Sequence, residues 1–378
     1  MTKPLTGTLV LSLDQAVAAP LTSRKLADAG ARVIKIERPE GDFGRHYDSL
    51  VHGQCTHFVW LNRGKESVVA DLTKAEDRRL FEAILAKADV LVQNLKPGAL
   101  AKFGYAVEKL RERQPCLICC SISGYGDEGP YRDRKAYDML IQAESGLASI
   151  TGGPEGPARV GVSVVDICTG MNAYEAILEA LIGRGRSGQG ADIRVSMFDC
   201  MMEWMAVPML YTEYGMPPRR MGLTHPALAP YGVFESADKV PILISIQNDR
   251  EWVTLCAKVL GRPELGKDPR FATSSARTAN RPKTDGLVAR CFAGHAVEPL
   301  SRLLEAAEIA FARVNDVEGI LHHPHLRRMR VGSPAGPIAM PAPPARWMGE
   351  ADATLEASFG PLPALGEHTE AVRREFLG

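Results

Sequence analysis

The segment GVSVVDICTGM, residues 161–171, places the acidic side chain of Asp166 between a β-branched run and a helical pattern. Residues 161–165 predict a short strand, and residues 171–182 predict a helix because their apolar side chains recur at a spacing of about 3.6. A carboxylate at such a strand-to-helix turn faces the free backbone N–H groups of the helix, which favours its ionised form. It is then either a nucleophile or an ordinary helix cap, and this segment alone leaves both roles open.

The composition is that of a globular chain without net charge. Its 378 residues, 45% of them hydrophobic, are enough for one large or two ordinary domains with real cores. Lys plus Arg equal Asp plus Glu at 45 each, so no overall field attracts nucleic acid or an anionic membrane. The apolar run within residues 1–15 is too short for a signal peptide or a membrane span. We therefore expect a cytoplasmic protein that binds neither nucleic acid nor membrane.

Strands alternate with helices through the first half of the chain. The pattern predicts strands at residues 8–13, 31–37, 66–71, 89–94 and 116–121, and helices at residues 21–29, 75–87 and 100–113. Alternation at this spacing is typical of a mainly parallel, doubly wound sheet, so we expect a Rossmann-like α/β fold.

Two glycine patterns of nucleotide-binding proteins are absent from this sheet. The first strand is followed by SLDQAVAAP, residues 12–20, which contains no glycine and therefore lacks the G-x-G-x-x-G turn of NAD enzymes. GRGRSGQG, residues 183–190, follows a helix and lacks the Lys-Ser/Thr ending of a P-loop. We interpret it as a helix C-cap and a hairpin leading into a strand at residues 191–197, and we expect no nucleotide cofactor.

Beyond residue 200 the pattern changes to that of a smaller α+β domain. A helix is predicted at residues 200–210, a hairpin at 232–246, and further helices at 251–260 and 283–292. Four prolines between residues 217 and 230 indicate a linker. The predicted division is a large domain over residues 1–200, a linker over 201–228, a small domain over 229–312 and a C-terminal segment over 313–378.

Cysteine and histidine clusters do not predict a metal site. The chain has eight cysteines, and CLICC, residues 116–120, lies in an apolar run that predicts a buried strand. No second cysteine pair completes a tetrahedral ligand set. His322, His323 and His325 are interrupted by Pro324, which breaks helical spacing. We expect reduced, packed thiols and no metal.

Seven segments occur in an order that resembles the class III CoA-transferase family, also called CaiB/BaiF. They are LADAGARVIKIERPEGD (26–42), LNRGKESVVADL (61–72), ADVLVQNLKPGAL (88–100), SISGYGDEGPYRDRKAYD (121–138), RVGVSVVDICTGM (159–171), GRSGQGADIRVSMFD (185–199) and LGEHT (365–369). The resemblance covers nearly the whole chain.

The resemblance implies that Asp166 is the catalytic nucleophile. Its carboxylate would attack an acyl-CoA to give a mixed anhydride, and CoA would then return to form an aspartyl-CoA thioester. Neither ATP nor a metal is required, and coenzyme A is the only group to be bound. The resemblance further implies an obligate homodimer of interlocked rings, whose C-terminal segments return to the large domain.

The family also implies which residues contact CoA. Arg38 matches a position that contacts the nucleotide portion, and the other matching positions are Asn94, Lys102, Lys135 and Tyr137. Phosphates favour fixed cations, which agrees with this set. Without the resemblance, Arg38 and Lys102 would be ordinary solvated charges.

The chain departs from the family pattern at two places. A family glutamine near the first strand is Val17 here, so a backbone N–H would have to replace its contact with the oxyanion. Formyl-CoA transferases carry a glycine run over the active site, whereas this chain has ILISIQNDREW at residues 242–252. Formyl transfer to oxalate is therefore disfavoured.

Two alternatives to a transferase stay open. One is an α-methylacyl-CoA racemase, which resembles this chain but uses paired bases to move a proton. Where racemases have Gly-His-Asp this chain has Ala136, Tyr137 and Asp138, and Gln247 stands where they carry a glutamate, so competent bases are missing. The other is a non-catalytic acyl-CoA-binding homologue.

The substrates are predicted by resemblance alone. Family members similar to this chain use succinyl-CoA or a similar donor and short dicarboxylic acids as acceptors. A dicarboxylate needs a second cationic anchor, and the sequence leaves four candidates open: Arg63, Arg159, Arg219 and Arg220. His225 is a further candidate for lining the substrate end, although a structural hydrogen bond is its simpler role.

Overall fold

The computed structural model describes residues 3–346 and 359–378. Its contacts divide the chain into two compact units. The first unit comprises Met1–Leu147, Arg159–Val207 and Arg327–Gly378, and the second comprises Ala148–Ala158 and Pro208–Leu326. The chain passes from one unit to the other at residues 147–148, 158–159, 207–208 and 326–327. The predicted C-terminal segment includes residues 347–358, which lie outside the described part of the chain.

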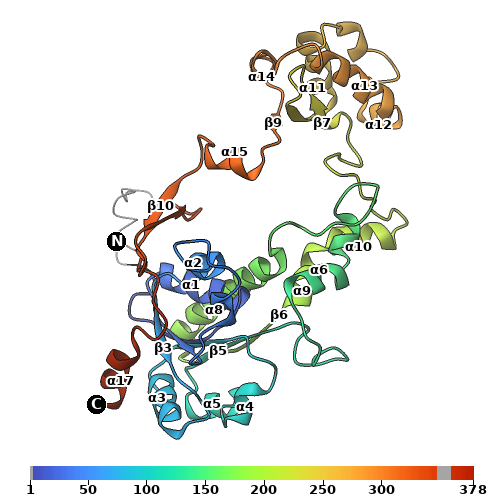
Figure 1. Cartoon of the computed structure of the whole chain (residues 1–378). Coiled ribbons are helices and arrows are strands. Elements are labelled where there is room, and N and C mark those ends of the chain that lie inside the picture. The colour runs from blue at the N-terminus through green and yellow to red at the C-terminus, as the bar shows by residue number, and fades with distance from the viewer. Residues whose placement is uncertain (1–2, 347–358) are drawn as a thin grey trace. The chain divides into compact units, whose positions relative to one another are not determined.

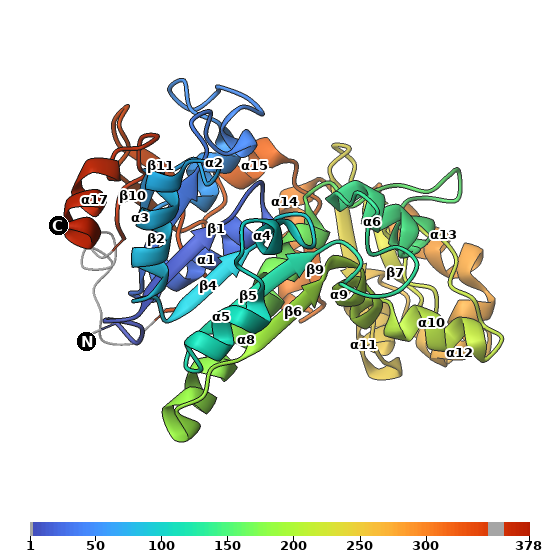
Figure 2. The same ribbon diagram turned by 90° about the horizontal axis from the view of Figure 1, so that it is seen from below.

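The first unit is built on a six-stranded parallel sheet, and the predicted doubly wound arrangement is confirmed. Its strands are β1 (Leu9–Leu13), β2 (Arg32–Glu37), β3 (Lys65–Val69), β4 (Val90–Gln93), β5 (Ile118–Ser123) and β6 (Asp192–Ser196). They lie in the order β3-β2-β1-β4-β5-β6, which Figure 2 shows from β2 to β6. The order reverses beside β1, so a crevice is expected at the carboxyl ends of β1 and β4.

Helices cover both faces of this sheet (Figure 1). Alternate strand residues belong to two separate cores. Helices α1 (Ala18–Asp28) and α8 (Val164–Ser187) cover the face that contains Val10 and Val33. The opposite face, with Leu11 and Ile34, is covered by α3 (Ala75–Leu85), α4 (Ala99–Lys102), α5 (Val107–Arg113) and α17 (Thr369–Leu377). Both faces are buried, as parallel sheets require.

The remaining elements of the first unit follow the strands at the carboxyl edge of the sheet or belong to the C-terminal segment. They are a 3-10 helix η1 (Phe43–Arg45), α2 (Thr56–Leu61), α6 (Asp138–Glu144), α9 (Met197–Trp204) and the antiparallel pair β10 (Arg328–Val331) and β11 (Ile338–Pro341). Two further helices, α7 (Leu147–Ile150) and α10 (Ala206–Glu213), span the boundaries between the units.

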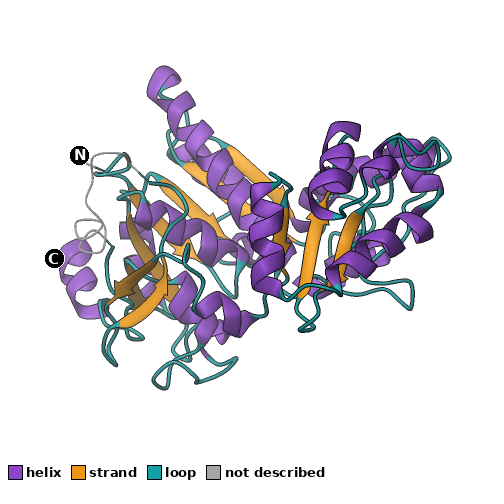
Figure 3. Cartoon of the chain, turned by 90° about the horizontal axis from the view of Figure 1, so that it is seen from above, coloured by secondary structure: helices purple, strands orange, loops and turns teal. Residues whose placement is uncertain are grey.

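The second unit has a three-stranded antiparallel sheet with its own core. Its strands are β7 (Tyr231–Glu235), β8 (Pro241–Ser245) and β9 (Phe311–Arg313). Its helices are α11 (Asp249–Thr254), the π-helix η2 (Leu255–Val259), the 3-10 helix η3 (Pro263–Gly266), α12 (Ser274–Ala279), α13 (Arg281–Phe292), α14 (Val297–Ala306) and α15 (Val317–Leu321). Figure 3 shows the helices of the chain in purple and its strands in orange. Trp252, Phe271 and Phe292 lie in the core, and the predicted hairpin is confirmed.

Three local predictions are wrong. Residues 161–165 do not form a strand, because α8 already begins at Val164 and runs for 24 residues. Gly188 ends α8 with φ 70° as a C-cap, but no hairpin follows, since β6 pairs with β5 in parallel. The helices predicted at residues 100–113 and 200–210 are each divided, into α4 and α5 and into α9 and α10. Among the described residues, no helix combines the length and apolarity needed to cross a bilayer.

Helices α1 and α8 approach each other closely at Gly170. A Cβ atom added to Gly170 would lie 2.6 Å from the carbonyl oxygen of Ala18 and 3.0 Å from the Cβ of Leu21. The hydroxyl of Thr22 donates a hydrogen bond to the carbonyl of Gly170 at 3.1 Å. The two helix backbones therefore pack without an intervening side chain at this point, which requires glycine.

We predict that Gly170→Ala destabilises the first unit. The added methyl group meets backbone that cannot move independently, so the free energy of unfolding should fall by about 1–3 kcal/mol in urea denaturation. Gly183→Ala is the matched control, because nothing lies within 4 Å of an added Cβ on the same helix. That control should gain about 0.5–1 kcal/mol through helix propensity. Equal effects of the two substitutions would contradict the close packing.

Candidate active site

A cavity of about 530 Å³ lies at the carboxyl ends of β1, β4 and β5. Its lining includes the loop after β1, residues 15–18, the loop after β4, residues 94–97, and residues 122–124 at the end of β5. Four of the predicted site residues line it together: Asn94, Lys135, Tyr137 and Asp166. This is the position at which doubly wound sheets bind their ligands.

Arg38 and Lys102 lie elsewhere. Arg38 lines a second cavity of about 310 Å³ at the ends of β1 and β2. Gln15 and Leu95 line both cavities, so the two are adjacent. Lys102 lines neither; it is exposed on α4, although its neighbours Ala99 and Phe103 line the second cavity.

Asp166 lies in the first turn of α8, but another carboxylate caps that helix. Asp138, at the start of α6, accepts hydrogen bonds at its Oδ1 from the backbone N–H of Val165 at 2.8 Å and of Asp166 at 3.3 Å. Its Oδ2 accepts from Gln142 at 2.7 Å. The backbone N–H of Ala18 on α1 instead acts on the carboxylate of Asp166 and lowers its pKa. Asp138 therefore fills the capping role that the sequence left open for Asp166.

The environment of Asp166 favours its protonated form more than water does. Burial, and then the negative charge of Asp138, raise the pKa of Asp166 to about 7, against the lowering effect of the Ala18 N–H. The prediction that the helix terminus favours ionisation is therefore wrong in direction. The reason is that the carboxylate is partly buried and its nearest charge is a like charge.

Val17 and Asn94 shape the loop that faces Asp166. Val17 is the N-cap residue of α1 and makes no side-chain cap, so the first N–H groups of α1 are left to the cavity. Both polar atoms of the Asn94 side chain bond the backbone of Gln15: Oδ1 accepts from its N–H at 2.9 Å, and Nδ2 donates to its carbonyl at 2.8 Å. Asn94 thus supports the cavity wall as well as lining it.

Three ring side chains complete the wall, and the sequence did not predict them. Phe43, Tyr47 and His57 line the cavity. Tyr47 packs edge-on against Phe43 at 5.9 Å and against His57 at 5.4 Å between ring centroids. Burial, followed by the carboxylates of Asp42 and Asp166, raises the pKa of Tyr47 to about 12, so its hydroxyl is a neutral donor. No periodic pattern marks residues 43–57, so only the spatial arrangement identifies them.

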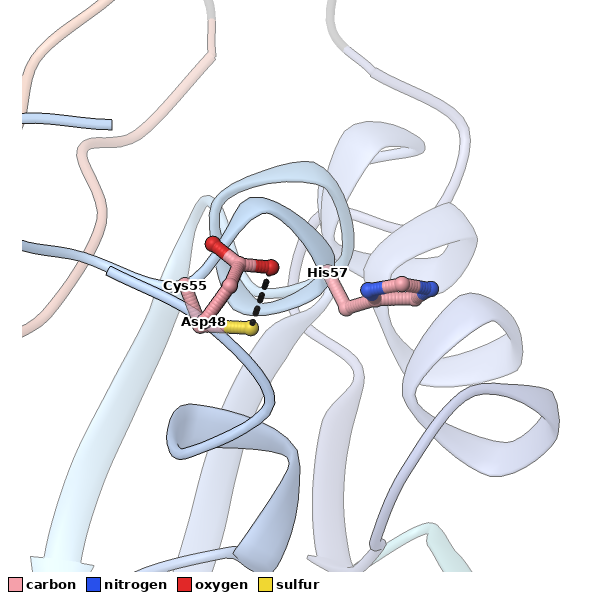
Figure 4. A group of neighbouring side chains, drawn as sticks. All are labelled: Asp48, Cys55 and His57. Atoms are coloured by element: carbon pink, nitrogen blue, oxygen red, sulfur yellow. Dashed lines mark hydrogen bonds between the residues drawn. The ribbon is translucent and has the colours of Figure 1, made fainter. Parts of the chain in front are cut away.

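Asp48, Cys55 and His57 bring their ligand atoms within 4.8 Å of one another, as in some metal sites. Figure 4 shows that the His57 ring points away from the other two side chains. Asp48 accepts from the hydroxyl of Thr56 at 2.6 Å, from its N–H at 3.0 Å and from the N–H of Leu50 at 3.1 Å. These bonds, the hydroxyl first, lower the pKa of Asp48 to about 2. Asp48 acts here as a cap for α2.

The cavity carries an excess of cations. Arg132 pairs with Asp133 at 3.3 Å and Arg134 with Glu144 at 3.5 Å. Three further lining cations, Lys96, Lys135 and Arg159, have no ion-pair or hydrogen-bond partner for their side chains within residues 3–346 and 359–378. Such side chains are available to an anionic ligand.

Of the four arginines proposed as carboxylate anchors, only Arg159 lines this cavity. Arg63 is 2% exposed and makes a two-bond ion pair with Asp28, at 2.8 and 2.6 Å. Arg219 and Arg220 belong to the second unit, where Arg220 donates to the carbonyls of Gly153 and Ser149.

The histidine and glutamine candidates also belong to the second unit. The ring of His225 stacks on that of Tyr231 at 5.2 Å, and its Nδ1 accepts from the N–H of Ala227 at 3.2 Å. Gln247 lies before α11 and bonds Ser245 and Glu251. His225 therefore has the structural hydrogen bond that was its simpler interpretation.

Comparison with known proteins shows the family of this chain. A family model described as CoA-transferase family III matches residues 5–369. An acetyl-CoA:oxalate CoA-transferase from Acetobacter aceti is 37% identical over 380 residues, which cover 99% of this chain and 96% of the relative. A succinate–glutarate CoA-transferase from Agrobacterium fabrum is 34% identical over 394 residues, covering 98% and 95%.

A solved structure supports the same assignment. The crystal structure of a CAIB/BAIF family protein from Brucella suis has a TM-score of 0.85 and 35% sequence identity, and the match covers 100% of both chains. With a parallel sheet, a cavity at its carboxyl edge and an acid at the start of α8, this chain belongs to the CoA-transferase family III and is an enzyme of that type.

Proposed function

We propose that this enzyme transfers CoA from a donor acyl-CoA, such as succinyl-CoA, to a short dicarboxylic acid through Asp166. The observation that carries the proposal is the carboxylate of Asp166, which lines the cavity while Asp138 caps its helix. A carboxylate that is not needed for capping is free to react.

The proposed reaction has four steps. The Asp166 carboxylate attacks the thioester carbonyl, forming a mixed anhydride and releasing CoA thiolate. The thiolate attacks the aspartyl carbonyl, forming an aspartyl-CoA thioester and releasing the donor acid as its carboxylate. The acceptor carboxylate attacks this thioester, giving a second mixed anhydride and CoA thiolate. The thiolate then attacks the acceptor carbonyl, which yields the new acyl-CoA and restores Asp166.

The two adjacent cavities offer room for the parts of CoA. We assign the cavity of Asp166 to the thioester end, beside Asn94, Lys135 and Tyr137. Arg38 in the second cavity is suited to the nucleotide phosphates. Lys102, exposed on α4, has the least support as a contact. The chain's own residues supply the chemistry, so neither a metal nor a nucleotide cofactor enters these steps.

A dicarboxylate acceptor is supported by the relatives and by Arg159. The relatives' names specify oxalate and glutarate, both of which are dicarboxylic acids. Arg159 lines the cavity without a partner among the described side chains and is suited to hold the distal carboxylate. The donor is supported less strongly, since the names give acetyl-CoA for one relative and succinate for the other.

The racemase alternative is less well supported. A racemase requires two bases, and the cavity offers the exposed Tyr137 where a His would be needed. The Tyr137 hydroxyl is ordinarily a poor base near neutral pH. A non-catalytic homologue is separated from the enzyme by the trapping experiment below.

We further propose a cytoplasmic homodimer. In the second unit, four apolar side chains on α10 or directly after it are exposed in the single chain: Met209, Leu210, Tyr211 and Tyr214. Exposed apolar groups at this density are typical of protein interfaces. Sedimentation equilibrium that gives the mass of one chain would contradict the dimer.

Asp166→Asn should abolish formation of the aspartyl thioester. An amide cannot attack a thioester, so incubation with acyl-CoA and trapping with hydroxylamine or borohydride should label the wild-type Asp166 peptide and leave the variant unlabelled by mass spectrometry. Glu175→Gln, an exposed change on the same helix, should label normally. Tight CoA binding without a label in the wild type would favour the non-catalytic homologue.

Thioester formation should depend on pH with a midpoint near the pKa of about 7 raised by burial and Asp138. Only ionised Asp166 attacks, so the rate should fall as pH drops through this value. Asp138→Asn removes the neighbouring negative charge, so the pKa of Asp166 and the midpoint should both move down. Single-turnover rates across pH test this, with Asp199→Asn as the control. An unchanged midpoint in Asp138→Asn would contradict it.

Arg159→Gln should weaken use of dicarboxylate acceptors selectively. Loss of one charged hydrogen bond to the distal carboxylate should raise KM for glutarate by roughly 10- to 100-fold, while KM for butyrate changes little. Arg186→Gln, at the far end of α8, controls for net charge. If KM for both acids rises equally, Arg159 does not anchor the acceptor's second carboxylate.

A further inference from the structure

Two lysines and two aspartates lie buried beneath the loop that follows β1. Asp14 is 1% exposed, Lys35 0%, Asp42 3% and Lys65 3%. Each comes from a different part of the first unit, yet their charges balance. Burial of four charges is costly unless each is paired and hydrogen-bonded.

The pairing is complete. The ammonium of Lys35 bonds Oδ1 of Asp14 and lies 2.9 Å from Oδ2 of Asp42. The ammonium of Lys65 lies 3.1 Å from Oδ2 of Asp14 and 2.8 Å from the side-chain oxygen of Asn62. Burial has the largest effect on the pKa of Lys65 and lowers it; Asp14 raises this pKa, the charge of Lys35 lowers it further, and the result is a pKa of about 7. The pKa of Lys35 is raised, because Asp14 and Asp42 together outweigh the effect of burial. Lys35 is therefore the permanent cation of the group.

This group also holds the backbone of the loop above it. Lys35 donates to the carbonyl of Asp14 at 2.9 Å, and Asp42 accepts from the N–H of Ala16 at 3.1 Å. Asn94 bonds both the N–H and the carbonyl of Gln15, which lies between them. Ala16 has φ 62°, a conformation that non-glycine residues rarely adopt. The side-chain bonds therefore keep the loop in a shape that it would not hold alone.

The held loop ends where α1 begins. Val17 gives α1 no side-chain cap. The next residue, Ala18, lines the cavity together with Asp166, and its backbone N–H lowers the pKa of that carboxylate. An apolar layer could fill the same volume with equal or better stability, but it could not bond the loop backbone. The buried charges thus hold the backbone of the loop, which the stability of the core alone does not require.

We propose that Asp42 and Lys35 are positioning residues, which fix the loop of residues 14–18 so that the Ala18 N–H meets the reacting carboxylate of Asp166. The inference rests on the proposed acyl transfer through Asp166. Donors that are fixed before the reaction need no reorganisation during it, and a misplacement of about 1 Å can cost roughly 100-fold in rate.

Asp42→Asn tests the proposal in the full-length enzyme. The amide can still accept from Ala16 but no longer balances Lys35, so the loop should shift. Single-turnover formation of the aspartyl thioester should slow by about 10- to 100-fold. The dissociation constant of CoA itself, measured by calorimetry, should change little.

The pH profile separates positioning from a merely structural effect. Loss of the Ala18 N–H bond should raise the pKa of Asp166, so the midpoint of thioester formation should move up. Removing the charge of Asp42 lowers the pKa of Lys65, so an effect through Lys65 would move the midpoint down. The direction of the shift therefore identifies the group responsible.

Asn94→Asp is the second variant, needed if Asp42→Asn does not fold. The half-buried carboxylate keeps an acceptor for the Gln15 N–H but loses the donor to the Gln15 carbonyl. The proposal predicts slower thioester formation, whereas a residue that only contacts CoA would raise its dissociation constant and leave the rate unchanged. The latter result would overturn the proposal.

Asp28→Asn is the matched control, because it breaks the buried pair with Arg63 at the other end of α1. It should lower the melting temperature while the rate and the midpoint stay at wild-type values. If Asp28→Asn slows thioester formation as much as Asp42→Asn does, the effect is general destabilisation and the inference is wrong. Wild-type rates in Asp42→Asn and Asn94→Asp would also overturn it, while a wild type that forms no thioester would overturn the proposed function itself.

Discussion

The close contact between α1 and α8 is the constraint on which the site depends. Gly170 brings the α8 backbone against Ala18, so the beginnings of both helices lie at the same cavity wall. With a side chain at this crossing the helices would separate, and the Ala18 N–H would lose the carboxylate of Asp166. The sheet then fixes the absolute position, since α1 follows β1 directly and α8 packs on β5 and β6.

Two neighbouring carboxylates at the start of α8, Asp138 and Asp166, have different surroundings. Asp138 is held by hydrogen bonds that use both of its oxygens, whereas the pKa of Asp166 is raised by burial and by the negative charge of its neighbour. The raised pKa has a cost for stability. A carboxyl group that titrates at about 7 when folded and near 4 when unfolded stabilises the fold below pH 4 and loses that contribution as pH rises to 7. At neutral pH the first unit therefore tolerates a destabilising charge, as expected of a reactive group.

The sequence predicts the sheet well, but it does not predict the buried side chains that support the site, because their partners are distant in the chain. Strands such as β1 and β4 are buried on both faces, and their largely apolar sequences are local signals. Lys35 lies in the middle of β2, where a lysine ordinarily signals an exposed face, and only Asp14 and Asp42 make it a core residue. Val164 and Val165 suggested a strand because the start of their helix is capped by Asp138, which bonds Val165 and Asp166 from 27 and 28 residues earlier in the chain. Partners that are distant in sequence leave no periodic pattern.

The apolar side chain of Val17 fits the rigid loop. A glutamine side chain that holds an oxyanion must lose rotamer freedom each time it does so, whereas a backbone N–H in a fixed loop has already lost it in folding. Val17 is 4% exposed and packs with Leu21 and Leu61, and Ile167 of α8 contacts the same cluster. The apolar side chain thus joins the loop, α1 and the turn that carries Asp166 into one packed body. A chain that relies on backbone donors gains more from this packing than from a polar side chain at residue 17, because the direction of the Ala18 N–H is then set by the core.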